Sequence, residues 1–160
     1  MKPDTPTKLL RVGAKAIVAA LAKRGVKGRD FVRLPVMDPF AGEACLALEA
    51  ARAGNVLVLE RPVARLPERL VQRLAGVVMR RDLHGLPLEA GDVILRDRNA
   101  LVLLPAALAD QVAEEAAEAV AFEEFTAEQV NQGGGVYGLH IPSGDRARQA
   151  FQAWRRMKGR

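Results

Sequence analysis

The sequence predicts an α/β fold in a single domain that covers residues 1–160. Residues 55–59 are a buried-strand pattern, 66–74 a helical pattern opened by proline, and 77–79 another apolar run. Together these three segments resemble a βαβ unit. A hairpin pattern over 92–104 adds two more strands. Apolar residues make up 49% of the chain, which is enough to bury a core in one domain of this length.

The first third of the chain predicts two helices and a short strand. Leu9–Lys23 has apolar residues at near-helical spacing, and Gly25 follows as a C-cap. Phe31–Met37 is a strand candidate. Ala41–Ala53 is rich in strong helix formers, so we expect a helix that carries Cys45 on its packed face.

The second half predicts the hairpin and a long helix. A polar turn at Asp97–Asn99 separates two apolar runs, and Pro105 ends the second strand because proline lacks a ladder donor. A helix rich in alanine and glutamate follows over Ala106–Asn131. Glu115 falls on its apolar face, so we expect a kink, a break or an oligomer contact there. The triple glycine at 133–135 predicts a turn.

Charge is distributed unevenly. The net charge is +5, yet the 106–131 helix carries seven acidic residues and no Lys or Arg. Both termini are therefore strongly basic, including a predicted basic helix over about 145–158. Such a surface attracts nucleic acid or an acidic partner, or its basic and acidic faces meet within an oligomer. No recognition motif accompanies the charge and aromatic residues are only 4%, so we do not expect direct nucleic-acid binding.

The cysteine count and the lack of long apolar runs exclude further classes of protein. A single cysteine excludes an intramolecular disulfide and a multi-cysteine zinc site. The sequence has no apolar run long enough to span a membrane and no stretch of signal-peptide type before the first helix, so we expect a cytoplasmic protein.

An ordered set of motifs resembles one family. The set consists of Gly91–Pro105, Glu123-Glu124-Phe125, Gly133–Leu139, the tail from Pro142 to Arg155, and upstream Arg52–Val58. Taken in chain order, these motifs resemble those of the family that contains the regulator of ribonuclease activity A and the 4-hydroxy-4-methyl-2-oxoglutarate aldolases. The chain would be a shortened and divergent member of that family. The resemblance implies a swivelling β/β/α sandwich. It also implies a homo-oligomer, a trimer or a dimer of trimers, with active sites between subunits in the enzymes.

The same resemblance points to a candidate site. Enzymatic members have a glycine-rich loop after the strand matching 55–59, whose amides hold an oxo-acid carboxylate; here the residues are Glu60-Arg61-Pro62. Arg81 and Asp82 match the family's Arg-Asp pair. By resemblance, Arg81 would bind and polarise the oxo-acid and Asp82 would help hold a divalent cation. A charged strand end without chemistry explains the pair more simply.

We therefore predict that the chain is a non-catalytic protein-binding regulator or assembly component without a cofactor. The resemblance makes a ribonuclease or the RNA-degradation machinery the partner class. The alternative is a divergent aldolase or oxaloacetate decarboxylase, a carbon–carbon lyase that uses Arg81 and Asp82 with Mg²⁺ or Mn²⁺. The short segment 83–90, where the family has a longer one, favours loss of the pocket.

Overall fold

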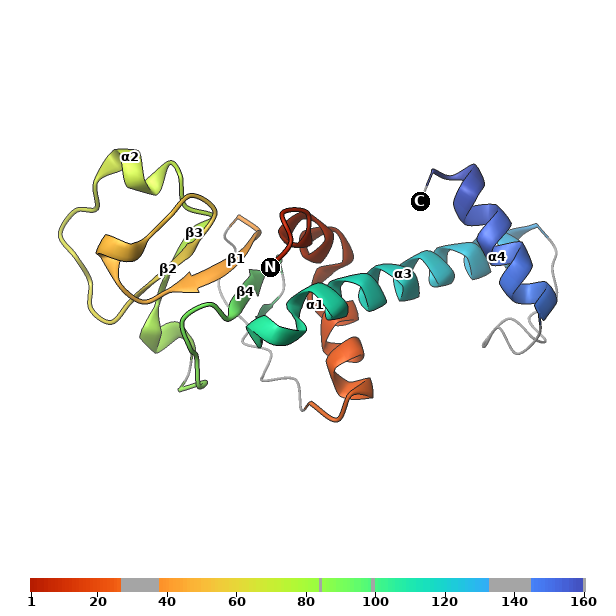
Figure 1. Cartoon of the computed structure of the whole chain (residues 1–160), viewed down its shortest axis with the longest axis horizontal. Coiled ribbons are helices and arrows are strands. Elements are labelled where there is room, and N and C mark those ends of the chain that lie inside the picture. Colours follow the sequence, from red (N-terminus) through yellow and green to blue (C-terminus); the bar gives the residue numbers. More distant parts are fainter. Residues whose placement is uncertain (27–37, 84, 99, 133–144, 160) are drawn as a thin grey trace. The chain divides into compact units, whose positions relative to one another are not determined.

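A computed structural model describes residues 1–26, 38–83, 85–98, 100–132 and 145–159 (Figure 1). The chain divides into two compact units, Met1–Ala117 and Glu118–Arg160, which are described separately below. The single domain over residues 1–160 stays a prediction. Among the described residues, none of the helices combines the length and the apolar composition that a membrane crossing requires.

The elements follow in chain order. They are α1 (Thr5–Lys23), β1 (Phe40–Cys45), η1 (Leu48–Ala50), β2 (Val56–Leu59), α2 (Glu68–Val71), β3 (Gly76–Met79), η2 (Arg80–Leu83), β4 (Val93–Arg96), β5 (Leu101–Leu104), η3 (Ala106–Leu108), α3 (Ala109–Asn131) and α4 (Asp145–Met157), where η marks a 3₁₀ helix. The first unit holds the sheet, and α3 contributes residues to both units.

One mixed five-stranded sheet organises the first unit, in the order β3-β2-β1-β4-β5. Strands β1, β2 and β3 are parallel, whereas β4 runs antiparallel to both β1 and β5. The α/β class is therefore confirmed, and so are the βαβ unit and the hairpin. The helix inside the βαβ unit covers only Glu68–Val71 of the predicted 66–74, and Pro67 lies immediately before it.

Alternation along the strands divides the core between the two faces of the sheet. On one face, Val93 and Leu95 of β4 join a cluster with residues of α1 and the start of α3. That part of α3 contributes four fully buried residues at helical spacing: Ala109, Val112, Ala113 and Ala116. On the other face, Ile94 packs with Val56, Val58 and Val78 of the parallel strands and with Leu83 and Leu88 of the segment that follows β3.

Helix α1 confirms the predicted 9–23 helix and extends it to Thr5. At Gly13 the backbone leaves helical geometry, with φ 77° and ψ 166°. Asp97 compensates for this interruption, because its Oδ2 accepts the Ala14 amide at 2.8 Å. The other oxygen, Oδ1, accepts the Ala100 amide at 2.8 Å and closes the β4–β5 turn. At the far end Gly25 has φ 69° and follows the helix as the predicted cap.

Acidic side chains of α3 partner the basic α1. Lys8 pairs with Glu114, and Arg24 pairs with Glu115. The Arg24 guanidinium lowers the pKa of the Glu115 carboxyl. The kink or break expected at Glu115 is wrong: α3 continues from Ala109 to Asn131, and the charge of Glu115 is balanced within the chain.

The helix predicted over Ala41–Ala53 is wrong. Residues 40–45 form β1 in the middle of the sheet, and only a 3₁₀ turn follows. Each helix former contributes a few tenths of a kcal/mol, about 0.7 at most, so the packing of a central strand overrides it. Gly42 permits this packing, because a Cβ there would lie 2.3 Å from the Gly54 carbonyl oxygen. Cys45 is buried as expected, but in a strand.

The second unit contains the remainder of α3 and the helix α4, which confirms the basic C-terminal helix. Its core is an aromatic cluster of Phe122, Phe125, Phe151 and Trp154, with neighbouring ring centroids 5.3–6.1 Å apart. Glu128 accepts a hydrogen bond from Trp154 Nε1 at 2.8 Å and pairs with Lys158 at 2.8 Å. The predicted strand 31–37 and the turn at 133–135 lie outside the described residues.

Candidate functional site

The candidate oxo-acid site lies at the carboxyl ends of the parallel strands β2 and β3. Leu59 and Met79 are paired in register, so the residues after them, Glu60 and Arg80, leave the sheet at the same edge. Glu60 Oε1 lies 3.9 Å from Arg80 Nε. In open sheets, ligands bind at the carboxyl ends of parallel strands. A carboxylate–guanidinium pair therefore lies at the edge of the sheet where the sequence resemblance predicts the oxo-acid site.

Of the two paired side chains, that of Arg80 is the more buried. Its side chain is about one-third exposed, against 71% for Glu60. Among the described residues, Arg80 Nη1 is buried without a hydrogen-bond partner. Pro62 lies two residues after Glu60 and has no amide hydrogen. An anion would meet the negative Glu60 carboxylate here and one backbone donor fewer than a glycine-rich loop supplies.

Arg81 and Asp82 lie in the 3₁₀ helix η2, directly after β3. Their side chains are 73% and 43% exposed, and Arg81 Nε lies 3.7 Å from Asp82 Oδ1. Leu83, the last residue of η2, is fully buried and fixes the turn to the sheet. Within the described ranges, no group of three or more His, Cys, Asp or Glu side chains is arranged to hold a metal ion. The catalytic and metal roles of Arg81 and Asp82 stay predictions.

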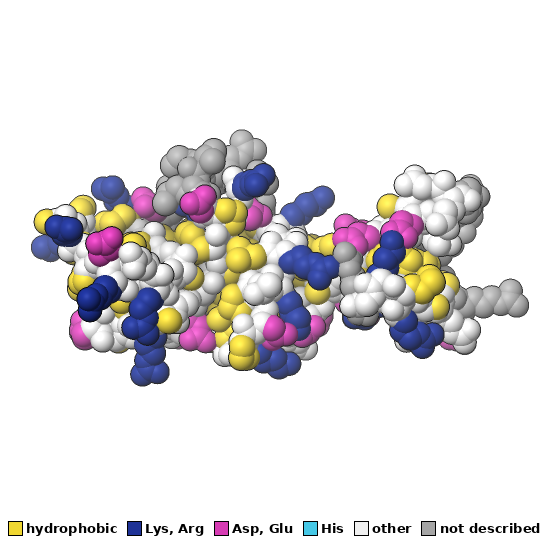
Figure 2. All heavy atoms as spheres, turned by 90° about the horizontal axis from the view of Figure 1, so that it is seen from above, with side chains coloured by type: hydrophobic (Ala, Val, Ile, Leu, Met, Phe, Trp, Pro, Cys, Tyr) yellow, Lys and Arg dark blue, Asp and Glu magenta, His cyan; other side chains and the backbone are white. Residues whose placement is uncertain are grey.

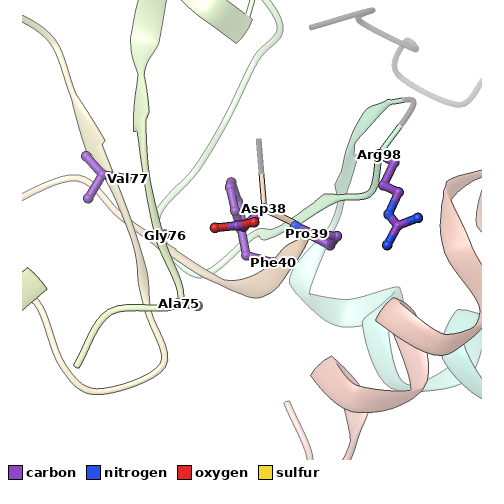
Figure 3. A pocket seen from close by; sticks show the side chains of 7 residues that line it. All are labelled: Asp38, Pro39, Phe40, Ala75, Gly76, Val77 and Arg98. Atoms are coloured by element: carbon purple, nitrogen blue, oxygen red, sulfur yellow. The ribbon is translucent and has the colours of Figure 1, made fainter. Parts of the chain in front are cut away.

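A pocket of about 560 Å³ lies elsewhere in the same unit (Figure 3). It is lined by Asp38, Pro39, Phe40, Ala75, Gly76, Val77 and Arg98. These residues belong to the beginnings of β1 and β3 and to the β4–β5 turn, whereas Arg81 and Asp82 follow the end of β3. The candidate site residues thus do not line this pocket.

The register of the sheet explains how the pocket forms. Phe40 pairs with Arg96, so Asp38 and Arg98 lie two positions further along the two antiparallel strands. The Phe40 ring packs against Gly76, where a Cβ would lie 2.8 Å from ring carbon Cδ1. The pocket thus combines an apolar wall with one carboxylate and one guanidinium; in Figure 3 Asp38 lies just before β1, and Arg98 lies apart from it in the β4–β5 turn. The sequence analysis did not single out Asp38 or Arg98, because the strand register decides which segments line one pocket.

Two aspartates within the family-like motif have structural contacts. Asp92 Oδ2 accepts the Glu89 amide at 3.0 Å, and its Oδ1 accepts the Ala106 amide at 3.2 Å. Asp97 caps α1 and the hairpin turn, as described above. These two aspartates of the family-like motif therefore stabilise the scaffold of this chain.

Comparisons with solved structures give the same fold. A crystal structure of an uncharacterized protein from Pseudomonas syringae pv. tomato str. DC3000 aligns with a TM-score of 0.62 and 12% identity, covering 88% of this chain and 98% of that one. A structure described as one of the novel cellulases from microbes associated with the gut ecosystem gives 0.58 and 12%, with coverages of 78% and 87%.

A third similar structure is RraAS2 of Streptomyces coelicolor, described as an unusual member of the RNase ES inhibitor RraA protein family. It has a TM-score of 0.56 and 18% identity, covering 79% of this chain and 97% of that one. No protein-family model and no curated protein sequence matches the chain. At these identities the likeness concerns the fold: the chain has an α/β fold similar to that of an RraA-family protein.

Proposed function

We propose that this chain is a non-catalytic protein on an RraA-like scaffold and acts as a protein-binding regulator or assembly component. The observation that carries the proposal is the sequence Glu60-Arg61-Pro62, with Glu60 facing Arg80 at the edge where an oxo-acid cradle belongs. A carboxylate repels an anionic substrate, and proline removes a donor from the loop. Both changes weaken oxo-acid binding without disturbing the sheet.

The description of one structural neighbour suggests the partner class, and the sequence resemblance suggests the assembly. The Streptomyces coelicolor neighbour belongs to a family described as RNase ES inhibitors. A ribonuclease, or a component of the RNA-degradation machinery, is therefore the partner class that we propose. We also propose that the protein is a homotrimer, that it is located in the cytoplasm and that it has no resident cofactor.

The alternative function is a divalent-metal-dependent aldolase or oxaloacetate decarboxylase. The pair Arg81 and Asp82, placed directly after the carboxyl end of β3, favours it. A divalent cation needs several oxygen ligands. The described residues offer no group of three ligand-type side chains, so a cation at Asp82 would depend on water and substrate oxygens for most of its ligands.

Turnover measurements separate the two functions. Purified protein is incubated with oxaloacetate and with 4-hydroxy-4-methyl-2-oxoglutarate, in Mg²⁺, in Mn²⁺ and in EDTA. We expect no pyruvate release above the metal-only background, and the same result for Arg81→Ala. Metal-dependent release that Arg81→Ala abolishes would establish the enzyme and overturn the proposal. Affinity capture by the folded chain that recovers no specific protein would also count against a binding role.

A further inference from the structure

Four arginines form an exposed surface between β2 and β3. We call it the arginine surface: Arg61, Arg65, Arg69 and Arg73. All four are exposed, and among the described residues none of them forms an ion pair or a side-chain hydrogen bond. Within residues 61–73 the sole acidic side chain is Glu68, which accepts a hydrogen bond from Gln72. The segment therefore presents a concentrated positive charge.

Several cations elsewhere in the chain have carboxylate partners. Lys8 contacts Asp4 and Glu114, Arg24 contacts Glu115, and Lys158 contacts Glu128. Carboxylates of α3 thus offset part of the positive charge of α1 and its C-cap Arg24 within the first unit. The arginine surface lacks such balance, so a partner that supplies carboxylates gains its full electrostatic attraction.

Apolar side chains lie on the same segment. Val63 is 45% exposed and Val71 is 42% exposed. Figure 2 shows dark blue and yellow side chains interspersed at the end of the first unit where Figure 1 places β2, α2 and β3. The segment 61–73 has no lysine and no aromatic residue. Arginine beside apolar side chains, with lysine depleted, is typical of protein interfaces. A single-stranded RNA site would supply aromatic stacking platforms.

We propose that the arginine surface docks an acidic protein segment. Carboxylates of the partner accept from the arginine guanidinium groups, whose planar fork matches a carboxylate with two parallel hydrogen bonds. Apolar side chains between those carboxylates cover Val63 and Val71, which removes their surface from water. This inference rests on the proposed binding function and specifies the chemistry of its partner.

The test uses the full chain and a labelled synthetic peptide of repeated Glu-Glu-Leu units. Fluorescence anisotropy is measured against this peptide, against the same peptide with Gln in place of Glu, and against single-stranded poly(U). We expect the acidic peptide to bind, the Gln peptide to bind at least about tenfold more weakly, and the affinity to fall with salt between about 0.05 and 0.3 M. Binding of poly(U) without binding of the acidic peptide would overturn the proposal in favour of RNA.

Matched charge reversals locate the binding surface. The double variant Arg65→Glu/Arg69→Glu should lose at least about tenfold in peptide affinity. The control Arg11→Glu/Lys15→Glu changes the net charge equally at exposed positions of α1 and should bind nearly as the wild type does. Circular dichroism verifies that both variants fold. Equal losses of peptide affinity in the two variants would mean that only net charge matters, and would overturn the proposal that the arginine surface is the docking site. Metal-dependent turnover refutes the proposed function, whereas peptide results refute only this inference.

Discussion

Asp97 joins two parts of the chain that are far apart in sequence. One carboxylate oxygen caps the α1 segment that restarts after Gly13, and the other closes the turn between β4 and β5. A sequence pattern identifies Asp97 as a turn residue, since aspartate favours such positions. It cannot identify the Ala14 amide as a partner, because that contact depends on how α1 packs against the sheet.

Replacing Asp97 by alanine leaves the Ala14 and Ala100 amides without their acceptor. We expect Asp97→Ala to lower the free energy of unfolding by about 1–3 kcal/mol. Asp97→Asn keeps one side-chain acceptor and should fall between alanine and wild type. Urea unfolding followed by circular dichroism measures both. The control is Glu89→Ala, which removes an exposed carboxylate from a loop. If Asp97→Ala is as stable as this control, the cap does not stabilise the fold.

At the scale of elements, sequence patterns predict those segments whose local preference and final environment agree. The apolar runs of β2, β3 and the hairpin are examples, and so are α1 and α4. The prediction for residues 41–53, which include most of β1, fails because their alanine, leucine and glutamate residues favour a helix locally. The position of β1 between β2 and β4 decides otherwise. Gly42 is a local signal against a helix, since glycine disfavours a helix interior. In the structure Gly42 permits the close approach of Gly54.

For the candidate site, too, some features follow from local sequence and others depend on how the strands pair. The positions of Glu60, Arg81 and Asp82 after strands follow from the sequence, and the structure places them there. The contact between Glu60 and Arg80 requires the parallel register of β2 and β3. The Asp38–Arg98 pocket requires the antiparallel register of β1 and β4. Neither register is encoded within a short window of sequence.

The contact between α1 and α3 makes stability depend on pH. The Arg24 guanidinium lowers the pKa of Glu115 below 4.5, and the Thr5 hydroxyl lowers the pKa of Asp110 below 3.8. A depressed carboxyl pKa gives stability that is present above the unfolded-state pKa and lost as pH falls through the folded-state pKa. We therefore expect unfolding midpoints to fall once the pH drops below about 4.5.

Neutral variants on α3 test this assignment. Glu115→Gln cannot titrate, so its urea midpoint should change less than that of the wild type between about pH 5 and about pH 3. Glu118→Gln is the matched control, because Glu118 is exposed and, among the described residues, has no ion-pair partner. It should follow the wild-type profile. Identical pH profiles for wild type and Glu115→Gln would show that the Arg24–Glu115 pair does not contribute.

At the scale of the molecule, charge is organised more specifically than a net value of +5 suggests. The sequence separates an acidic helix from basic termini, and it leaves open whether they meet within the chain or between copies. In the structure, Glu114 and Glu115 of α3 pair with Lys8 and Arg24 inside the first unit, and Glu128 pairs with Lys158 inside the second. The four arginines of residues 61–73 have no such carboxylate partner among the described residues, so their positive charge is available to a binding partner.

The two compact units contain separate probes of unfolding. Trp154, the one tryptophan of the chain, is 4% exposed in the aromatic cluster of the second unit. Cys45, the one cysteine, is 8% exposed in β1 of the first unit. Fluorescence of Trp154 therefore reports on the helices α3 and α4, and thiol labelling of Cys45 reports on the sheet.

The variant Phe125→Ala tests whether the units unfold together. The Phe125 ring is 3% exposed and lies 5.9 Å from the Trp154 ring, so its removal should cost the aromatic cluster about 3–5 kcal/mol. We expect the Trp154 midpoint to move to lower urea while the midpoint of Cys45 labelling changes little, because the ring's aromatic contacts lie within the second unit. Equal shifts of both midpoints would instead mean that the chain unfolds as the single domain that its sequence predicts.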